Sequence, residues 1–140
     1  MNVIVNVSAL VYPTEMEEKV KTAINNIVQV DLDFEDFGVP RLYGEGNIEH
    51  LRKLHLLLRE ERILDTARHI FLTGIEGNTI QFCMSKQVAF VGKVNFPAGE
   101  ESLGSIDIEI FAENKEELMR IIDWLAPETI DGKPAVEIEL

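Results

Sequence analysis

Ile106-Asp107-Ile108-Glu109-Ile110 alternates isoleucine with acidic residues. Successive side chains of a β-strand point to opposite faces of a sheet, so this segment predicts a strand with one buried and one polar face. Strands of parallel sheets are buried on both faces and appear as nearly continuous apolar runs. The alternation therefore favours an antiparallel sheet.

Comparable patterns recur along the chain. They predict strands at 2–8, 79–84 and 136–140, and a strand from Val28 that ends near Gly38. A short strand is also expected around Leu42 within the turn-rich segment 38–46. A second apolar run covers 88–96 and is followed by a turn at Pro97-Ala98-Gly99.

Two helices are indicated by capping residues and by apolar side chains at three-and-four spacing. Thr14 and Glu17 fit a capping box that opens a helix through Ile27. Its expected buried stripe is Met16, Val20, Ala23, Ile24 and Ile27. Asn114 followed by Glu117 predicts a second cap, and Pro127 ends the helix that follows.

The helical region from Asn47 to Phe71 contains two apolar stripes that do not align. At roughly 100° per residue, the stripe through Leu58 and the stripe beginning at Ile63 differ in direction by roughly 160°. One straight helix cannot bury both against one sheet. We therefore predict a break within Leu58 to Arg62, with Glu60 and Glu61 in the first turn of the second helix.

These segments together predict an α+β fold, a two-layer antiparallel sheet with helices packed mainly on one face. A length of 140 residues fits a single domain, 1–140. The opening segment has no basic flank or cleavage site, so it indicates a strand and not a signal peptide. No apolar run approaches the roughly 20 residues that cross a bilayer. The lone Cys83 excludes an internal disulfide, and a cytoplasmic protein without membrane contact is expected.

Charge is spread unevenly along the chain. The formal net charge is −12, but the window from Arg41 to His69 holds six bases and five acids, so it carries +1 and the remainder −13. All three histidines also lie in this window. An anionic partner can approach where negative charge is relieved. A pI near 4.6 nevertheless disfavours sequence-independent DNA binding, which requires Lys and Arg to displace counterions.

The basic side chains suggest a nucleic-acid-binding surface on two helices and on the segment that follows the strand at 79–84. Its expected members are Arg52, Arg59, Arg62, Arg68, Lys86 and Lys93. The alternative is an ordinary solvated helix face, on which Asp65 pairs with Arg62, Arg68 and His69 at three-and-four spacing.

A small-molecule site is a weaker hypothesis. It requires Tyr43, Arg62, Lys86 and Gln87 to converge on one pocket, with Tyr43 and Gln87 as ligand contacts. The glycines after Tyr43 do not match a dinucleotide or phosphate-binding motif and fit positive backbone angles in a turn. No histidine spacing predicts a metal site, and Cys83 fits a buried strand position. No cofactor, metal or catalytic residue is predicted, so an enzyme is not indicated.

Two segments resemble a known family. Arg62-Ile63-Leu64-Asp65-Thr66-Ala67-Arg68 and Ser85-Lys86-Gln87-Val88-Ala89-Phe90-Val91-Gly92-Lys93 look like segments of uncharacterised archaeal proteins of similar length, and the resemblance covers essentially the whole chain. It implies the fold of large-subunit ribosomal protein five and a role in RNA binding or with the exosome. Relatives tend to carry Asn where this chain has Ser85, and the acidity departs from that of a ribosomal RNA binder.

The leading hypothesis is therefore a non-enzymatic, RNA-binding or ribonucleoprotein-associated protein. The alternative is a homodimeric interaction module without nucleic acid. In that case Val136, Ile138 and Leu140 would belong to an edge strand that pairs across a two-fold axis.

Overall fold

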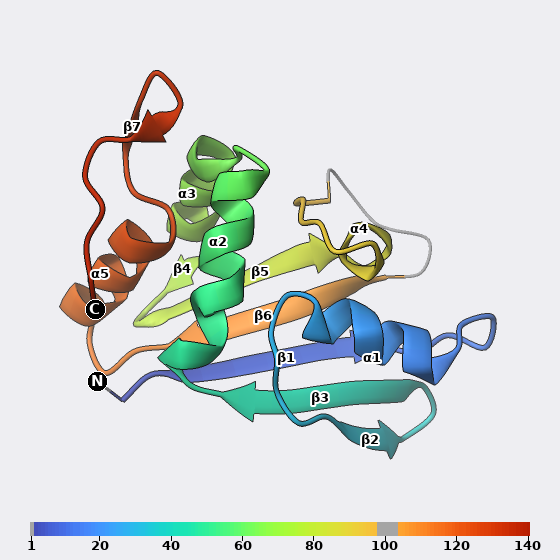
Figure 1. Ribbon diagram of the computed structural model, residues 1–140. Helices are drawn as coiled ribbons and strands as arrows, with labels where there is room; N and C mark the ends of the chain where they lie inside the picture. The colour runs from blue at the N-terminus through green and yellow to red at the C-terminus, as the bar shows by residue number, and fades with distance from the viewer. Residues whose placement is uncertain (1, 98–103) are drawn as a thin grey trace.

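The computed structural model describes residues 2–97 and 104–140 and consists of one six-stranded sheet with helices on one face (Figure 1). In chain order the elements are β1 Ile4–Leu10, α1 Glu17–Asn25, β2 Asp33–Asp36, β3 Pro40–Gly46, a 3-10 turn Ile48–Leu51, α2 Arg52–Glu60, α3 Leu64–Thr73, β4 Ile75–Glu76, β5 Thr79–Ser85, α4 Lys86–Phe90, β6 Ser105–Phe111, α5 Lys115–Leu125, β7 Thr129–Ile130 and β8 Lys133–Pro134.

The strand order is β2-β3-β1-β6-β5-β4, and every neighbouring pair is antiparallel. Val7 lies opposite Ile108, which lies opposite Phe82 on the next strand. Residues that face each other across strands share a face of the sheet, so these apolar rows form one continuous surface. The predicted α+β class and the alternating strand at 106–110 are confirmed.

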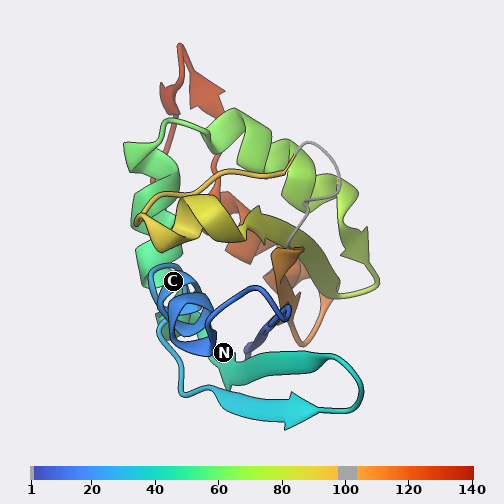
Figure 2. The same ribbon diagram turned by 90° about the vertical axis from the view of Figure 1, so that its right-hand side faces the viewer.

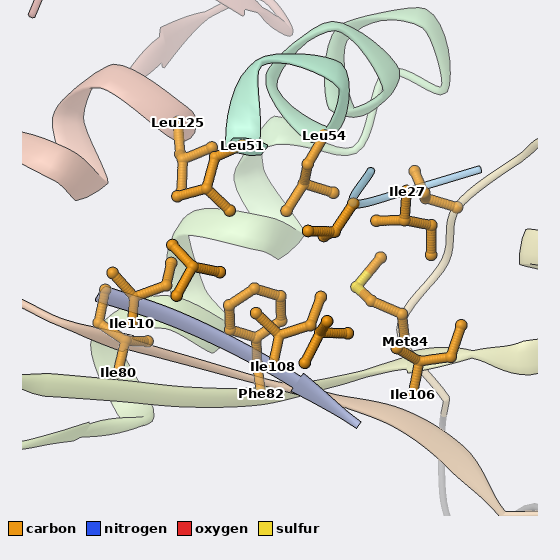
Figure 3. Close-up of a cluster of buried hydrophobic side chains, with 14 of the residues drawn as sticks. Ile27, Leu51, Leu54, Ile80, Phe82, Met84, Ile106, Ile108, Ile110 and Leu125 are labelled. Atoms are coloured by element: carbon orange, nitrogen blue, oxygen red, sulfur yellow. The ribbon is translucent and has the colours of Figure 1, made fainter. Parts of the chain in front are cut away.

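This apolar surface is buried beneath the helices. Figure 3 shows Ile80, Ile108 and Ile110 of the sheet below Leu51 and Leu125 of the helical layer. These side chains are fully excluded from solvent. Burial of a branched apolar side chain contributes about 1.5–3 kcal/mol, so the two layers stabilise each other along this seam.

The strand predicted from Val28 to near Gly38 is wrong for residues 28–32. Val28 and Val30 are buried as the alternation requires, yet they lie in an irregular segment outside the strand ladder. Only β2, Asp33–Asp36, pairs with the sheet, as its edge strand. The alternation correctly predicts that Val28 and Val30 are buried, but it does not predict whether the backbone pairs with a neighbouring strand.

The segment from Tyr43 to Gly46 is a strand and not a turn. β3 pairs with both β1 and β2, and neither glycine has a positive φ angle. A Cβ atom at Gly44 would lie 2.6 Å from the backbone oxygen of Asp31, and one at Gly46 would lie 2.7 Å from Nδ1 of His50. The glycines are needed because neighbouring segments cross the strand closely.

The predicted break in the long helical region is confirmed. α2 ends at Glu60, α3 begins at Leu64, and Arg62 between them has a positive φ of 57°. The placement of the two glutamates is wrong: Glu60 ends α2 and Glu61 is its C-cap. The turn thus lies slightly later than the charge pattern suggested, because Arg62 supplies the left-handed backbone.

The predicted caps had mixed outcomes. Asn114 accepts a hydrogen bond from the backbone N–H of Glu117 at 2.8 Å, as expected. The box at Thr14 does not form, because α1 begins at Glu17 with Met16 as its N-cap, without a side-chain cap. Met16 is also exposed rather than part of the buried stripe.

The predicted C-terminal strand is absent: residues 136–140 are irregular and follow the small β7–β8 hairpin. Val136 is 65% exposed, while Ile138 and Leu140 pack partly against the core. Pairing of two copies through such a strand therefore has no basis in this fold. In the run at 88–96, α4 ends at Phe90 and irregular chain follows. Residues 98 and 99 of the predicted turn lie outside the described residues.

Candidate nucleic-acid interface

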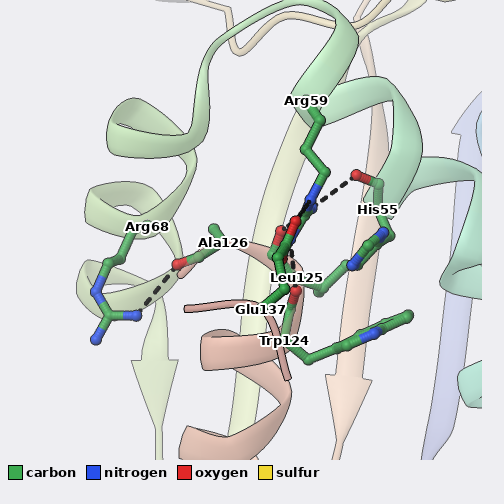
Figure 4. Close-up of polar contacts among 7 residues, drawn as sticks. All are labelled: His55, Arg59, Arg68, Trp124, Leu125, Ala126 and Glu137. Carbon is green, nitrogen blue, oxygen red and sulfur yellow. Dashed lines mark hydrogen bonds and ion pairs between the residues drawn. The ribbon is translucent and has the colours of Figure 1, made fainter. Parts of the chain in front are cut away.

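Arg59 is held by the protein itself. Its guanidinium donates to the backbone oxygens of His55, Leu125 and Trp124 at 2.8, 3.0 and 3.1 Å. It also forms a two-bond ion pair with the Glu137 carboxylate, at 2.8 and 2.6 Å (Figure 4). These bonds hold the pKa of Glu137 below its ordinary value. The Arg59 side chain is only 16% exposed and its charge is neutralised by Glu137, so it is not available to bind a phosphate.

Arg68 has a similar role on α3. It donates to the carboxylate of Asp123 at 2.8 Å and to the backbone oxygen of Ala126 at 3.1 Å. A longer contact of 3.7 Å joins it to Glu128. The predicted partner Asp65 instead accepts a hydrogen bond from the hydroxyl of Thr129.

The two arginines together cap the C-terminal end of α5. The last carbonyl groups of a helix have no partner within the helix and carry a partial negative charge. α5 has no basic residue of its own in its last turn. Arg59 and Arg68 supply donors from α2 and α3, so they fasten α5 to the helical layer.

Lys86 is buried at the other end of the sheet. Its Nζ donates to the backbone oxygen of Leu10 at 2.8 Å and to the carboxylate of Glu15 at 3.0 Å. Its side chain is 5% exposed and lies 5.3 Å from the ring centroid of Tyr12. Lys86 therefore ties the first turn of α4 to the loop before α1.

The other three predicted contacts are accessible to a partner. Arg52 is 53% exposed and pairs with the exposed carboxylate of Glu49. Its guanidinium also lies 5.8 Å from the ring centroid of Trp124. Arg62 and Lys93 are exposed, and so is Lys53 beside Arg52. An exposed ion pair contributes little, so Arg52 can exchange Glu49 for a phosphate at small cost.

The proposed convergence on one pocket does not occur. Lys86 and Gln87 line a cavity between α1 and α4, whereas Tyr43 lines a hollow on the opposite, helix-free face of the sheet. Arg62 lines neither. The combined small-molecule site of Tyr43, Arg62, Lys86 and Gln87 is therefore wrong.

The helix-free face of the sheet is acidic. Cross-strand register places Glu45, Glu109, Asp107, Asp33 and Glu35 on this face with Arg41, Tyr43 and the half-buried Cys83. Arg41 pairs with Glu35 at 2.9 Å. Five acids against one base repel a phosphate chain.

Cys83 lies on this polar face and is half-buried, so its prediction as a core residue is wrong. Its thiol donates to the Asp107 carboxylate at 3.0 Å. Burial, and then the bond to Asp107, raise the pKa of the thiol and leave it a poor nucleophile. Within residues 2–97 and 104–140, no group of three or more His, Cys, Asp or Glu residues is placed to hold a metal ion. No helix in the same ranges is long and apolar enough to span a bilayer.

Sequence reasoning missed the residues that neutralise the arginines. Glu137 lies 78 positions from Arg59, and Asp123 lies 55 positions from Arg68. Pairs so far apart follow no local spacing rule, so the sequence does not predict them. Lys53 is one of the six bases of the window, yet it is not among the predicted contacts, whereas its neighbour Arg52 is.

Comparison with known proteins identifies the family of this chain. A family model described as RNA binding matches residues 4–113. A UPF0201 protein of Methanopyrus kandleri is 42% identical over 139 residues, which cover 92% of this chain and 87% of the relative. This chain belongs to the UPF0201 family. A second UPF0201 protein, from Methanosarcina acetivorans, is 41% identical and covers 97% of this chain and 92% of its own length.

A solved UPF0201 structure supports the same assignment. The crystal structure of the UPF0201 protein from Methanococcus jannaschii is 37% identical, with a TM-score of 0.84 over 97% of this chain and 99% of that one. The resemblance to an archaeal family and the predicted fold class are thereby confirmed. The family model that matches this chain is described by RNA binding and not by a reaction.

Proposed function

We propose that this UPF0201 protein binds RNA through the helical side of the molecule and not through the open face of its sheet. The observation that carries the proposal is that the open face holds five acids and one base, whereas exposed bases occur on the helical side, interspersed with exposed acids such as Glu49 and Glu60. The open face is strongly acidic, while the exposed bases Arg52, Lys53 and Arg62 lie on α2 and its turn into α3. The RNA-binding description of the matched family supports the choice of partner.

The proposed contact surface comprises Arg52, Lys53, Arg62 and Lys93. Phosphate binding requires cations that can release their present partners. Arg59, Arg68 and Lys86 belong to the scaffold, because removing them from their carbonyl and carboxylate partners would leave buried acceptors unsatisfied. Their role in this account is to hold α2, α3 and α4 in position.

Binding titrations of labelled single-stranded RNA at 50 and 200 mM salt test the proposal. Affinity should fall steeply with salt, with a slope of about 0.7 per phosphate contact on a logarithmic scale. Arg52→Glu with Arg62→Glu should weaken binding at least tenfold and reduce the slope by about 1.4, twice the single-contact value.

The matched control is Lys115→Glu with Lys133→Glu. It changes the net charge by the same amount at exposed positions on α5 and β8. If both double variants weaken binding equally, only the overall charge matters and the assigned surface is wrong. If the unmodified chain binds RNA with no salt dependence, phosphate contacts by these bases are excluded.

We also propose that the protein forms a homodimer, through a different surface from that predicted by the sequence. The β2–β3 hairpin projects at one edge of the sheet (Figure 2) and exposes Phe34, Phe37 and Val39, with Phe37 89% exposed. Exposed apolar clusters of this kind favour association. Asp33 and Asp36 on the same hairpin would face their copies, so salt should strengthen the dimer while it weakens RNA binding.

Light scattering coupled to size exclusion, at low and high salt, measures this directly. Phe37→Ser should shift the population toward monomer, while Ile130→Ser at the exposed β7 strand should not. A monomer at high micromolar protein in both salts would contradict the dimer.

The proposed setting of the protein is the cytoplasm, where RNA is present and a lone thiol such as Cys83 stays reduced. We also propose that the fold of this protein is related to that of large-subunit ribosomal protein five.

A further inference from the structure

The cavity between α1 and α4 has no part in the phosphate contacts described above. It has a volume of about 360 Å³ and opens to solvent. Ligand pockets begin at roughly 300 Å³, so this one has room for a single ring system and not for a duplex. Its walls include Met16, Val20, Ala23 and Phe90.

The cavity keeps its shape because both of its ends are fastened. At one end Lys86 bonds to Leu10 and Glu15, as described above. At the other, the side-chain amide of Asn26 donates to the backbone oxygens of Ala89 and Phe90 at 2.9 and 3.3 Å. The space between the helices is therefore set by hydrogen bonds and not by the contents of the cavity.

The lining is suited to a planar ring. Phe90 is 42% exposed at the cavity, and the ammonium group of Lys19 lies 6.0 Å from the centroid of its ring. An aromatic side chain with a neighbouring cation is the arrangement that binds unstacked bases of single-stranded RNA and their phosphates.

Polar groups at the cavity can bind the edge of such a ring. Oε1 of Glu15 already accepts from the backbone N–H of Tyr12 and from Lys86. A carboxylate has about four acceptor sites, so Glu15 can accept further hydrogen bonds. The exposed amide of Gln87 offers a donor and an acceptor side by side. A carboxylate favours a base with an exocyclic amine over uracil, whose edge would place a carbonyl oxygen against it.

We propose that this cavity holds one unpaired, amine-bearing base of single-stranded RNA, with adenine or cytosine preferred over uracil. Phe90 stacks on the base, Glu15 and Gln87 contact its edge, and Lys19 contacts the adjoining phosphate. The inference rests on the proposed RNA-binding function and adds base preference to a surface that otherwise recognises only phosphates.

Titration of the full chain with ten-nucleotide A and U oligomers tests the inference. The A oligomer should bind about tenfold more tightly at equal salt. Phe90→Ala should lower affinity for the A oligomer five- to tenfold without changing the salt slope, because Phe90 carries no charge. Ile130→Ala, another exposed apolar truncation, should leave both affinities unchanged. Gln87→Ala, at an exposed position, should reduce the A-over-U preference without affecting folding.

The outcomes separate this inference from the proposed function. Salt-dependent binding that is equal for both oligomers and unaffected by Phe90→Ala overturns the cavity and leaves the phosphate surface standing. If neither oligomer binds, the proposed function fails. Adenosine monophosphate then tests the cavity alone: binding that Phe90→Ala abolishes supports it, and no binding overturns it.

Discussion

A basic residue is available to a partner only if the folded chain has not already neutralised it. Arg52 and Arg59 lie two turns apart on α2 and look equivalent in the sequence. Arg52 has an exposed, local carboxylate partner, whereas Arg59 has, besides the local carbonyl of His55, two carbonyls of α5 and a carboxylate brought from distant segments. The enrichment of arginine between Arg41 and His69 could be recognised from the sequence, but the division of these arginines into scaffold and surface depended on tertiary contacts.

Replacing Arg52 or Arg59 with alanine measures the difference between an arginine on the surface and one in the scaffold. Arg59→Ala should lower the free energy of unfolding by about 1–3 kcal/mol, because it leaves buried carbonyl acceptors without donors. Arg52→Ala should change it by less than about 0.5 kcal/mol, since an exposed pair three residues apart contributes little. Urea denaturation gives both values. Equal losses would show that Arg59 is not a structural cap.

The pH dependence of stability should report His55, which stacks on Trp124 at 4.6 Å between ring centroids. Burial of the ring is the main cause that lowers the pKa of His55 below the ordinary 6.5, and the positive charges of Arg59 and Arg52 lower it further. The negative charges of Glu137 and Glu139 oppose this effect without cancelling it. The unfolded chain therefore binds a proton more readily than the folded one. Stability should be complete above pH 6.5 and should fall as pH drops through the folded pKa.

His55→Gln should remove that loss. The lowered pKa of Glu137 gives a second loss at more acidic pH, starting near its ordinary value of 4.5. Glu137→Gln should remove this second loss and enlarge the first, because the Glu137 charge no longer raises the pKa of His55. Urea midpoints measured from pH 8 down to about pH 2, a range that covers the titration of Glu137 as well as that of His55, separate the two steps. A stability that is flat between pH 7 and 5 would contradict the assignment to His55.

At the scale of elements, side-chain periodicity predicted burial better than it predicted pairing. The alternation at 106–110 coincided with a central strand, but that at 28–34 belongs mostly to irregular chain that buries Val28 and Val30 without a ladder. β3 was underestimated, because Pro40 and two glycines resemble turn residues until the close crossings over Gly44 and Gly46 are known. The break between α2 and α3 was predictable, since two misaligned apolar stripes cannot share one helix.

The turn at that break offers a test. Arg62 has a left-handed backbone, which costs a non-glycine residue about 1–2 kcal/mol. Glycine loses about 0.5–1 kcal/mol through the freedom of the unfolded chain, so Arg62→Gly should raise the free energy of unfolding by about 0.5–1 kcal/mol. Glu61→Gly, next to it with φ of −81°, should lower stability instead. The same sign for both variants in thermal denaturation would contradict the strain assigned to Arg62.

At the scale of the whole molecule, the net charge of −12 conceals two unlike faces. The charge window in the sequence located the helices that carry the exposed bases. It could not show that the acids of β2, β3 and β6 gather on the opposite face, because that arrangement depends on strand order and register. An acidic protein can bind RNA in this account because the repulsive face points away from the ligand.

Hydroxyl-radical footprinting with mass spectrometry, with and without single-stranded RNA, tests that claim most directly. Leu56 is exposed on α2 one turn from Arg52 and Lys53, and Tyr43 reports on the open face of the sheet. RNA should protect Leu56 from oxidation and leave Tyr43 unchanged. Protection of Tyr43 with Leu56 still reactive would place the RNA on the acidic sheet face and contradict the account.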